Sequence, residues 1–295
     1  MSILPATPIA FAGQLLNDIG VNELSLQSAQ TALATGNAIN QPSDNPPGAV
    51  ETLQLQAAQA RVSSYISSAN IGLGALGSAQ DALESALKTL NQAQDQLASA
   101  SQAQDSPTAM AAAGTGLQAL SSALMQIANT TYNGYAIFGG TSAASVAYDS
   151  SGNYQGNSEV ASLTVAAGTQ LSTGVTGDSV FGSGASSIFA VLGAAAGDLS
   201  SGNLAGAQAA ETQVSAYITK ANDAVATIGS LYDQFQQAGA AATSTSATLS
   251  TELGNVLGAN IASVDTTYQQ DQASLQAGLY AIANVLPKSL LSYLP

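Results

Sequence analysis

The sequence predicts a mainly α fold: an elongated coiled-coil helical rod formed by N- and C-terminal helices, with a small β-rich insertion domain. Two features of the 295-residue chain predict it. Apolar residues recur at alternating steps of four and three over long stretches toward both ends, which is the spacing of one face of a coiled-coil helix. In mid-chain that period gives way to a segment rich in Gly, Ser, Thr and Val, a composition typical of short strands and turns.

Helical stripes occupy the first half of the chain. One stripe begins near Leu15 and ends near Leu33, and the most regular one runs from Leu55 to Leu97. At about 1.5 Å per residue the second helix would be roughly 65 Å long, which is too long for a compact globule and suits a rod. Pro107 punctuates this helix, and a further helix follows it.

Two more stripes lie near the C-terminus, at Val214–Phe235 and at Leu257–Leu286. In a globular protein such a stripe is more often ordinary core than a partner interface. Four rod-length stripes with small or amide residues between them favour lateral association with other subunits instead. Gly72, Gly74 and Gly77 have the spacing of a dinucleotide-binding loop, but they lie inside the long helix rather than after a strand. We interpret them as positions where another helix can approach closely.

The mid-chain insertion is expected at residues 138–190. Its apolar residues, among them Val160, Leu163 and Val165, are flanked by glycines and predict short strands with a core of their own. Because the insertion lies between long helices, the helices before and after it must return alongside each other. The predicted division is 1–44 for an N-terminal inner helix and turn, 45–137 and 191–254 for the two parts of a middle helical region, 138–190 for the insertion, and 255–295 for a C-terminal inner helix.

Charge is scarce in this chain. Four Lys and Arg stand against 18 Asp and Glu, the net charge is −14, and charged residues make up 7% of the sequence. So few basic residues cannot form the patch that binds nucleic acid or an anionic membrane surface. No apolar run approaches the roughly 18 to 20 residues of a membrane helix, so no membrane insertion is expected. Subunit contacts are expected to rest on packing rather than ion pairs, and therefore to be insensitive to salt.

The absence of two residue types narrows the chemistry further. The chain contains no His and no Cys, which excludes Ser-His-Asp and Cys-His nucleophile sites and His/Cys zinc sites. Carboxylate chemistry stays open in the insertion, whose acids are Asp149, Glu159 and Asp178. Solvated loop acids are the more frequent case. We therefore expect a protein that is not an enzyme and carries no metal or other cofactor.

The segment from Leu33 to Val50, LATGNAINQPSDNPPGAV, resembles the N-terminal signature of the flagellin and hook-associated junction family. The matching positions are Leu33, Gly36, Ile39, Asn40, Pro42, Asp44, Pro46, Gly48 and Ala49. The motif also has a physical interpretation. Gly36 ends the first helix, residues 40–44 form a turn held by side-chain hydrogen bonds, and the Pro pair begins the long helix. Asn37 and Ala38 depart from the family, which commonly carries basic residues there.

Three further segments support the resemblance. One is Ser68–Leu73, early in the long helix. Another, Ala128–Thr141, resembles hook–filament junction members of the family more than filament flagellins. The C-terminus is similar as well, with Ser289, Leu290, Leu291, Tyr293 and Leu294 in register. Pro287 departs from the pattern, and a proline interrupts helices.

The resemblance implies a structural subunit of the extracellular axial part of the bacterial flagellum, most like the hook–filament junction subunit. It implies terminal helices that pair as an inner coiled coil, with copies of the chain, other axial proteins and an export chaperone as partners. Because the N-terminus lacks a positively charged first region, export without a cleavable signal peptide is expected. The expected subunit contacts are Leu15, Ile19, Leu26, Leu33, Leu257, Ile261, Val264, Tyr268, Leu275, Leu279, Ile282, Leu286, Leu290 and Leu291. The expected joint is formed by Gly36, Ile39, Asn40, Pro42, Asp44, Pro46 and Gly48.

Three alternatives stay open. Within the family, the chain would be the main subunit of the filament, a flagellin. A secreted carbohydrate-binding or carbohydrate-active protein would need paired acids and clustered aromatics in the insertion. A secreted translocator or effector built from coiled coils would leave flagella and swimming intact when deleted.

Overall fold

The computed structural model describes residues 8–102, 106–142 and 144–291, and the side chains within 13–102, 106–142 and 144–283. The chain divides into two compact units, 1–60 with 247–295 and 61–246, which we call unit 1 and unit 2. Helices dominate both, and the strands of the described ranges form two-stranded sheets. The predicted mainly α fold with a small β insertion is therefore confirmed.

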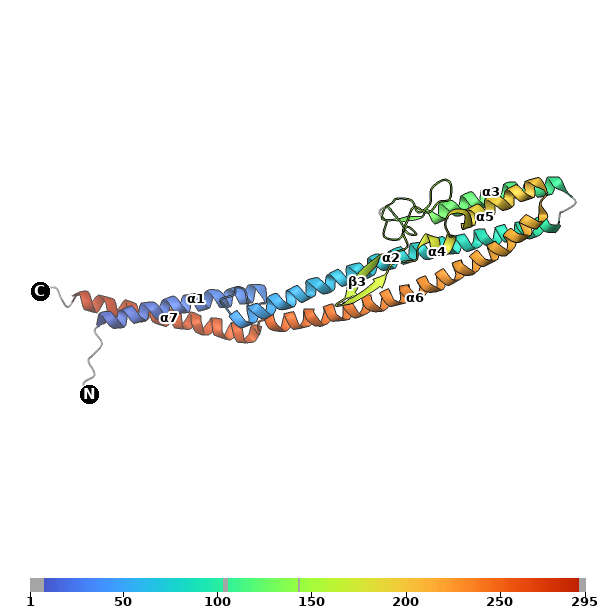
Figure 1. The fold of residues 1–295 in the computed structure, drawn as a ribbon. Helices are drawn as coiled ribbons and strands as arrows, with labels where there is room; N and C mark the ends of the chain where they lie inside the picture. Colours follow the sequence, from blue (N-terminus) through green and yellow to red (C-terminus); the bar gives the residue numbers. More distant parts are fainter. Residues whose placement is uncertain (1–7, 103–105, 143, 292–295) are drawn as a thin grey trace. The chain divides into compact units, whose positions relative to one another are not determined.

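Unit 1 is built on an antiparallel pair of helices, α1 (Pro8–Thr35) and α7 (Ile261–Leu291), which lie side by side in Figure 1. The Ser25 hydroxyl donates to Asp271 Oδ2 at 2.6 Å. Nearer the start of α1, Ile19 packs against Gly278, where an added Cβ would come within 3.0 Å of the Ile19 side chain. Later residues of α1 thus meet earlier residues of α7, so the two ends of the chain pair as predicted.

The last helix contains a proline. Pro287 lies within α7, whose backbone continues to Leu291. The interruption that Pro287 suggested in the sequence is therefore not found. A proline removes one backbone hydrogen bond and bends a helix, and the flanking turns can still continue it.

Unit 2 contains most of a second antiparallel pair, formed by α2 (Pro46–Gln102) and α6 (Leu204–Leu257), whose residues 46–60 and 247–257 belong to unit 1. Gly72 of α2 lies directly against the ring of Phe235 of α6, and an added Cβ at Gly239 would touch Ala69 at 3.4 Å. The predicted stripe of α2 is buried at every seventh residue, namely Leu76, Leu83, Leu90 and Leu97. This heptad repeat is the spacing that keeps one side of a helix against its partner.

Two shorter helices complete the helical part of unit 2. In Figure 1, α3 (Pro107–Ala128) and α5 (Ile188–Ser201) lie side by side. Each begins at a serine cap: Ser106 accepts from Ala109 N at 3.4 Å and Ser187 accepts from Ala190 N at 3.3 Å. Pro107 stands in the first turn of α3, where its missing N–H leaves no hydrogen bond unmade.

The segment between α3 and α5 contains four short strands and two short helical turns. Strands β1 (Thr131–Tyr132) and β2 (Tyr135–Ala136) form one hairpin, and β3 (Ser162–Ala166) and β4 (Thr169–Ser172) form the other. A helical turn α4 (Gly177–Phe181) and a 3₁₀ turn η1 (Gly184–Ser186) follow. The first hairpin turns at Asn133 and Gly134, which both have positive φ.

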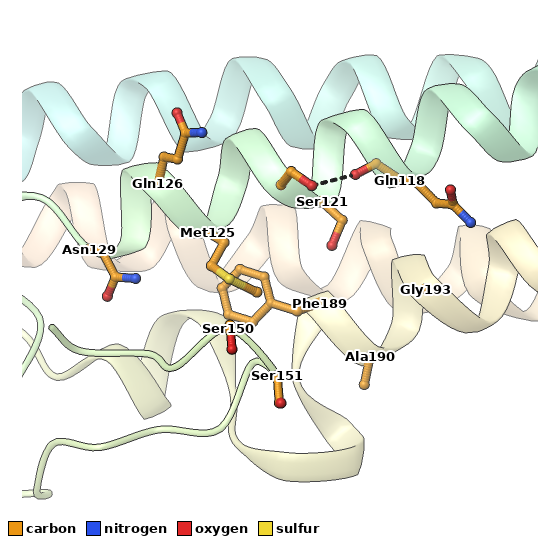
Figure 2. A pocket seen from close by; sticks show the side chains of 11 residues that line it. Gln118, Ser121, Met125, Gln126, Asn129, Ser150, Ser151, Phe189, Ala190 and Gly193 are labelled. Atoms are coloured by element: carbon orange, nitrogen blue, oxygen red, sulfur yellow. Dashed lines mark hydrogen bonds between the residues drawn. The ribbon is translucent and has the colours of Figure 1, made fainter.

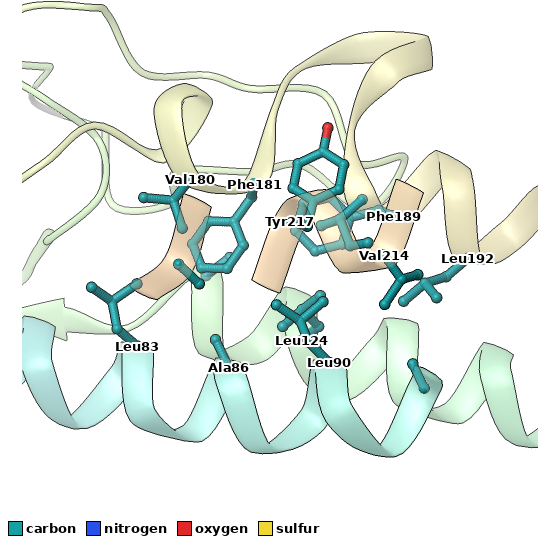
Figure 3. Packing of buried hydrophobic residues seen from close by; sticks show 14 of the residues in the cluster. Leu83, Ala86, Leu90, Leu124, Val180, Phe181, Phe189, Leu192, Val214 and Tyr217 are labelled. Atoms are coloured by element: carbon teal, nitrogen blue, oxygen red, sulfur yellow. The ribbon is translucent and has the colours of Figure 1, made fainter. Parts of the chain in front are cut away.

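The insertion shares its core with the helices, contrary to the expectation of a separate core. Phe181 and Phe138 meet edge to face at 5.3 Å, and Tyr148 and Phe189 meet at 4.9 Å. These aromatic rings belong to the same buried cluster as Leu83 of α2. Figure 3 shows Val180, Phe181 and Phe189 facing the leucines of α2. Two-stranded hairpins bury too little apolar surface to fold alone, so the segment folds onto the helices.

The first testable prediction concerns close packing of α2 on α6. Gly72→Ala should destabilise the folded chain by about 1–3 kcal/mol, because the new methyl group would overlap the Phe235 ring. Gly77→Ala is the matched control on the same helix, since an added Cβ there meets nothing within 4 Å. It should stabilise the chain by up to about 1 kcal/mol through helix propensity. Urea unfolding of both variants measures the difference, and equal midpoints would refute the packing.

Candidate assembly surface

The predicted joint is a hydrogen-bonded turn between α1 and α2. Gly36 ends α1 with φ 73°, and its N–H donates to Ala32 O at 2.9 Å. Asp44 holds the turn: its Oδ2 accepts from Asn40 N at 2.9 Å and from Gln41 N at 2.8 Å. The helix α2 then begins at Pro46. Both the end of the first helix and the side-chain-bonded turn lie where the motif places them.

Other motif residues pack this turn onto α2. Ile39 is buried, and Gly48 is the position that receives it: an added Cβ on Gly48 would stand 2.6 Å from Ile39 Cδ1. Asn45 Oδ1 also accepts from Gly48 N at 3.2 Å. A larger residue at Gly48 would therefore displace Ile39 from the start of α2.

The same turn is tied to the C-terminal part of the chain within unit 1. Ala38 N donates to Leu257 O at 2.6 Å, and Ala259 N donates to Gly36 O at 2.9 Å. Asn37 and Gly258 form an isolated antiparallel bridge at this point. Of these C-terminal residues the sequence predicts only Leu257 as a contact. Backbone pairing between remote segments leaves no side-chain pattern in a sequence, so the roles of Gly258 and Ala259 are not predictable from it.

The residues expected to make subunit contacts lie mostly on α1 and α7, and many of them are at least half-buried within the single chain. Ile19 is buried. The half-buried ones are Leu15, Leu26, Leu33, Leu257, Val264, Tyr268, Leu275 and Ile282. Ile261 and Leu279 are exposed. The side chains of Leu286, Leu290 and Leu291 lie outside the described residues, so their contacts stay a prediction.

α1 has a second apolar face, which its sequence pattern does not predict. Leu16, Val21 and Leu24 are 57%, 58% and 68% exposed, and we call these three residues the outer face of α1. At about 100° per residue they share an arc of about 140°, roughly opposite Leu15 and Leu26 on the side that meets α7. Their spacing is not the regular alternation of threes and fours. Only the paired structure shows which apolar positions of this helix are left over.

Each acid of the insertion accepts hydrogen bonds, Asp149 within its own turn and Glu159 and Asp178 from more distant residues. Asp149 Oδ1 accepts from Ser151 N at 2.8 Å and from Asn153 N at 2.9 Å. Glu159 accepts from the Thr141 hydroxyl at 3.5 Å, and Asp178 accepts from the Ser158 hydroxyl at 3.3 Å. In the part of the chain described here, no group of three or more acids could hold a metal ion.

Two tyrosines beside Asp178 have altered titration. Burial, followed by the neighbouring Tyr154 and Asp178, raises the pKa of Tyr148 above its ordinary value. Burial and the charge of Asp178 raise the pKa of Tyr154 to about 12. Their hydroxyls donate to backbone oxygens, Tyr148 to Gly182 O and Tyr154 to Phe138 O, each at 2.8 Å. Both rings therefore hold the insertion in place as neutral donors.

A large groove of unit 2 has no titratable lining residue. It holds about 740 Å³ between α3, α5 and the loop at Ser150 and Ser151. Figure 2 shows its serine and amide side chains, with Met125 and Phe189 at its floor. Without an acid, base or activated nucleophile, this groove lacks the groups that general acid–base or covalent catalysis needs.

One residue of the second matched segment has a structural role. Asn129, at the end of α3, accepts through Oδ1 from Ala147 N and Tyr148 N, each at 2.8 Å. Its Nδ2 donates to Tyr148 O at 2.9 Å. The amide thus fixes the loop that brings Tyr148 into the core.

These features define a class of helical proteins. Its members have long antiparallel terminal helices, a hydrogen-bonded turn between consecutive helices, and apolar helix faces that stay exposed in the single chain. Residues 10–143 match the family model of the bacterial flagellin N-terminal helical region. No helix in the described ranges combines the length and hydropathy of a membrane span. The chain is thus similar to flagellin-like helical proteins over nearly half its length.

The particular relatives are hook-associated proteins. Flagellar hook-associated protein 3 of Escherichia coli (strain K12) is 29% identical over 153 residues, which is 51% of this chain and 48% of that relative. The match therefore spans about half of the relative's length. The resemblance to the flagellin and hook-associated family, read from the sequence motifs, is confirmed.

Solved structures agree on the fold. A structure described as a flagellar hook-associated protein from Vibrio parahaemolyticus covers 73% of this chain and 100% of its own, with TM-score 0.67 and 18% identity. FlgL from Xanthomonas campestris covers 68% and 99%, with TM-score 0.62 and 16% identity. FlgL from Bacillus cereus covers 68% and 99%, with TM-score 0.58 and 17% identity.

The joint yields the second prediction. Asp44→Ala should speed hydrogen exchange of the Asn40 and Gln41 amides about tenfold, because both lose a charge-assisted acceptor. Asp44→Asn retains an acceptor oxygen and should show a smaller effect. Ser43→Ala, at the neighbouring exposed position, is the control. Unchanged exchange in Asp44→Ala would show that the carboxylate does not hold the turn.

The Asp149 turn yields the third prediction. Hydrogen bonds, first from the Asn153 side chain, lower the pKa of Asp149 below its ordinary value of 3.8. A lowered folded-state pKa stabilises the turn above the unfolded value, and that contribution is lost as pH falls through the lowered pKa. The amide shifts of Ser151 and Asn153 should therefore titrate below pH 3.8. In Asp149→Asn they should stay flat, and a midpoint above 3.8 would contradict the turn geometry.

Proposed function

We propose that the chain is a structural subunit of the extracellular axial part of the bacterial flagellum, positioned at the hook–filament junction. One observation carries the assembly part of this proposal. The pairing of α1 with α7 uses one apolar face of α1 and leaves Leu16, Val21 and Leu24 in water. Exposed apolar patches on a regular helix mark interaction sites, so the paired terminal helices would polymerise through these leftover faces.

The junction position has separate support. The curated relative is a hook-associated protein, and the Ala128–Thr141 and C-terminal segments resemble junction members. In the proposed assembly the partners are copies of the chain and neighbouring axial proteins. An export chaperone would cover the apolar faces beforehand, and the chain would leave the cell without a cleavable signal peptide.

The second candidate is the filament flagellin itself. The match to the flagellin N-terminal helical region favours it, since the same paired helices would serve a filament equally well. A carbohydrate-active role in the insertion has little support, because Asp149 is engaged in its own turn and Glu159 and Asp178 each accept from a side-chain hydroxyl.

Immunogold labelling of intact flagella separates the two positions. Label confined to a ring at the end of the hook supports a junction subunit, and label along the whole filament supports a flagellin. A deletion strain with normal flagella and normal swimming would overturn both, and would favour a secreted effector. Removing residues 265–295, which contain most of α7, should abolish incorporation, and incorporation of the truncated chain would refute polymerisation through paired helices.

The fourth prediction tests the outer face of α1. The double variant Leu16→Ser with Leu24→Ser should lower incorporation into flagella at least tenfold, since two exposed leucines would be lost from the contact. Its unfolding midpoint should stay near that of the wild type, because both side chains face water in the single chain. Val160→Ser, an exposed position in unit 2, is the control. Normal incorporation of the double variant would exclude this face.

A further inference from the structure

Unit 1 contains an apolar groove beside the joint. It encloses about 540 Å³, and the walls come from the turn after α1, the first turns of α2 and the last residue of α6. We call it the joint groove. Its apolar wall is formed by Ile39, Pro42, Pro46, Val50, Leu53 and Leu257. Leu53 is 65% exposed, so a large leucine at the rim stands in water in the single chain.

A buried hydroxyl in this wall has no partner. Thr52 lines the groove, its side chain is buried, and its Oγ1 makes no hydrogen bond. Other helical threonines of the chain donate to the carbonyl four residues earlier, as Thr89 does to Ser85 O at 2.9 Å. An unsatisfied buried polar group costs about 1–3 kcal/mol. The Oγ1 atom has almost no accessible surface, so an occupant of the groove bonds it only after the Thr52 side chain rotates toward the groove.

We propose that the joint groove receives the outer face of α1 of a second copy of this chain. This inference rests on the proposed polymerisation and names the surfaces that would carry it. Leu16, Val21 and Leu24 of one copy would pack between Val50 and Leu53 of the next. Rotation of the Thr52 side chain toward the groove would then let a polar group of the incoming helix bond its hydroxyl.

Charge favours a second copy as the occupant. Every copy carries a net charge of −14, so contacts between copies must use surfaces where acids do not face each other. No lining residue of the groove is charged, and the polar ones are Thr52 and amides such as Asn37 and Gln56. A basic partner would find no acid in the groove to pair with.

The chain's own α1 does not fill this groove. Within one copy, Leu24 lines a different cleft of about 380 Å³, together with Ser43 and Asp44. Asn40 and Gln41 line both cavities, so the groove and the outer face of α1 lie next to the same turn. Two different surfaces that bind each other form a heterologous contact, which builds rings or helical filaments. That geometry is the one an axial subunit requires.

Cysteine cross-linking tests this contact directly, because the chain has no cysteine of its own. In flagella assembled from the double variant Leu24→Cys with Leu53→Cys, mild oxidation should give a ladder of covalent multimers on a denaturing gel. Each copy would be linked through its groove to one neighbour and through α1 to another. Leu24→Cys with Ile71→Cys is the matched control, since Ile71 is also an exposed aliphatic residue of α2 but lies outside the groove. It should give no ladder.

A second variant tests the Thr52 hydroxyl. Thr52→Val keeps the shape and removes the unpaired polar group, so the single chain should unfold at the same or a higher urea concentration. Assembly should nevertheless weaken about fivefold to tenfold, because the bond to the incoming helix is lost. If Thr52 only stabilised the fold, its replacement would lower both the urea midpoint of the single chain and the extent of assembly.

The outcomes are distinguishable. If the wild-type chain is absent from flagella, both the proposed function and this contact are overturned. If the double-cysteine variant assembles and gives no ladder, or if Thr52→Val assembles normally, the groove contact is wrong while the proposed function stands. A ladder in the Leu24/Ile71 control would also overturn the specific contact.

Discussion

Close packing of antiparallel helices with only four basic residues for ion pairs is the constraint on which the structure depends. A chain with 4 basic residues cannot align its helices by alternating charges, so small residues set the contacts. Gly72 admits the ring of Phe235 in unit 2, and Gly278 admits Ile19 in unit 1. The glycine costs helix propensity, and the packing of a large side chain against bare backbone offsets that cost.

The turn between α1 and α2 is also held by few polar groups. One carboxylate, Asp44, satisfies two backbone N–H groups that would otherwise face water or each other. Backbone bonds from Ala38 and Ala259 then tie the turn to the end of α6. With these groups satisfied, Ile39 can be buried against Gly48. The unpaired hydroxyl of Thr52 stands out because its surroundings are otherwise satisfied.

Sequence patterns predict the helices well, but they do not predict which apolar surfaces stay exposed after the helices pair. Heptad leucines such as Leu83 and Leu90, the helix stop at Gly36 and the turn at Asp44 follow from local chemistry, which a sequence displays directly. The outer face of α1 depends on which side α7 covers, and that is a property of pairing between residues far apart. The sequence does not predict the shared core of the insertion for a similar reason: glycine-flanked strands indicate a change of structure, but nothing in the sequence shows which helices Phe138 and Tyr148 will contact.

Charge scarcity also sets how an assembled form would respond to salt. The groove and the outer face of α1 offer no opposite charges, so raising the ionic strength has no attraction between them to screen. It does screen the mutual repulsion of copies that each carry −14. Added salt should therefore leave the proposed contact intact or strengthen it slightly. If ion pairs held the subunits together, added salt would weaken the contact instead. The two cases therefore predict salt effects of opposite sign on the stability of the assembly.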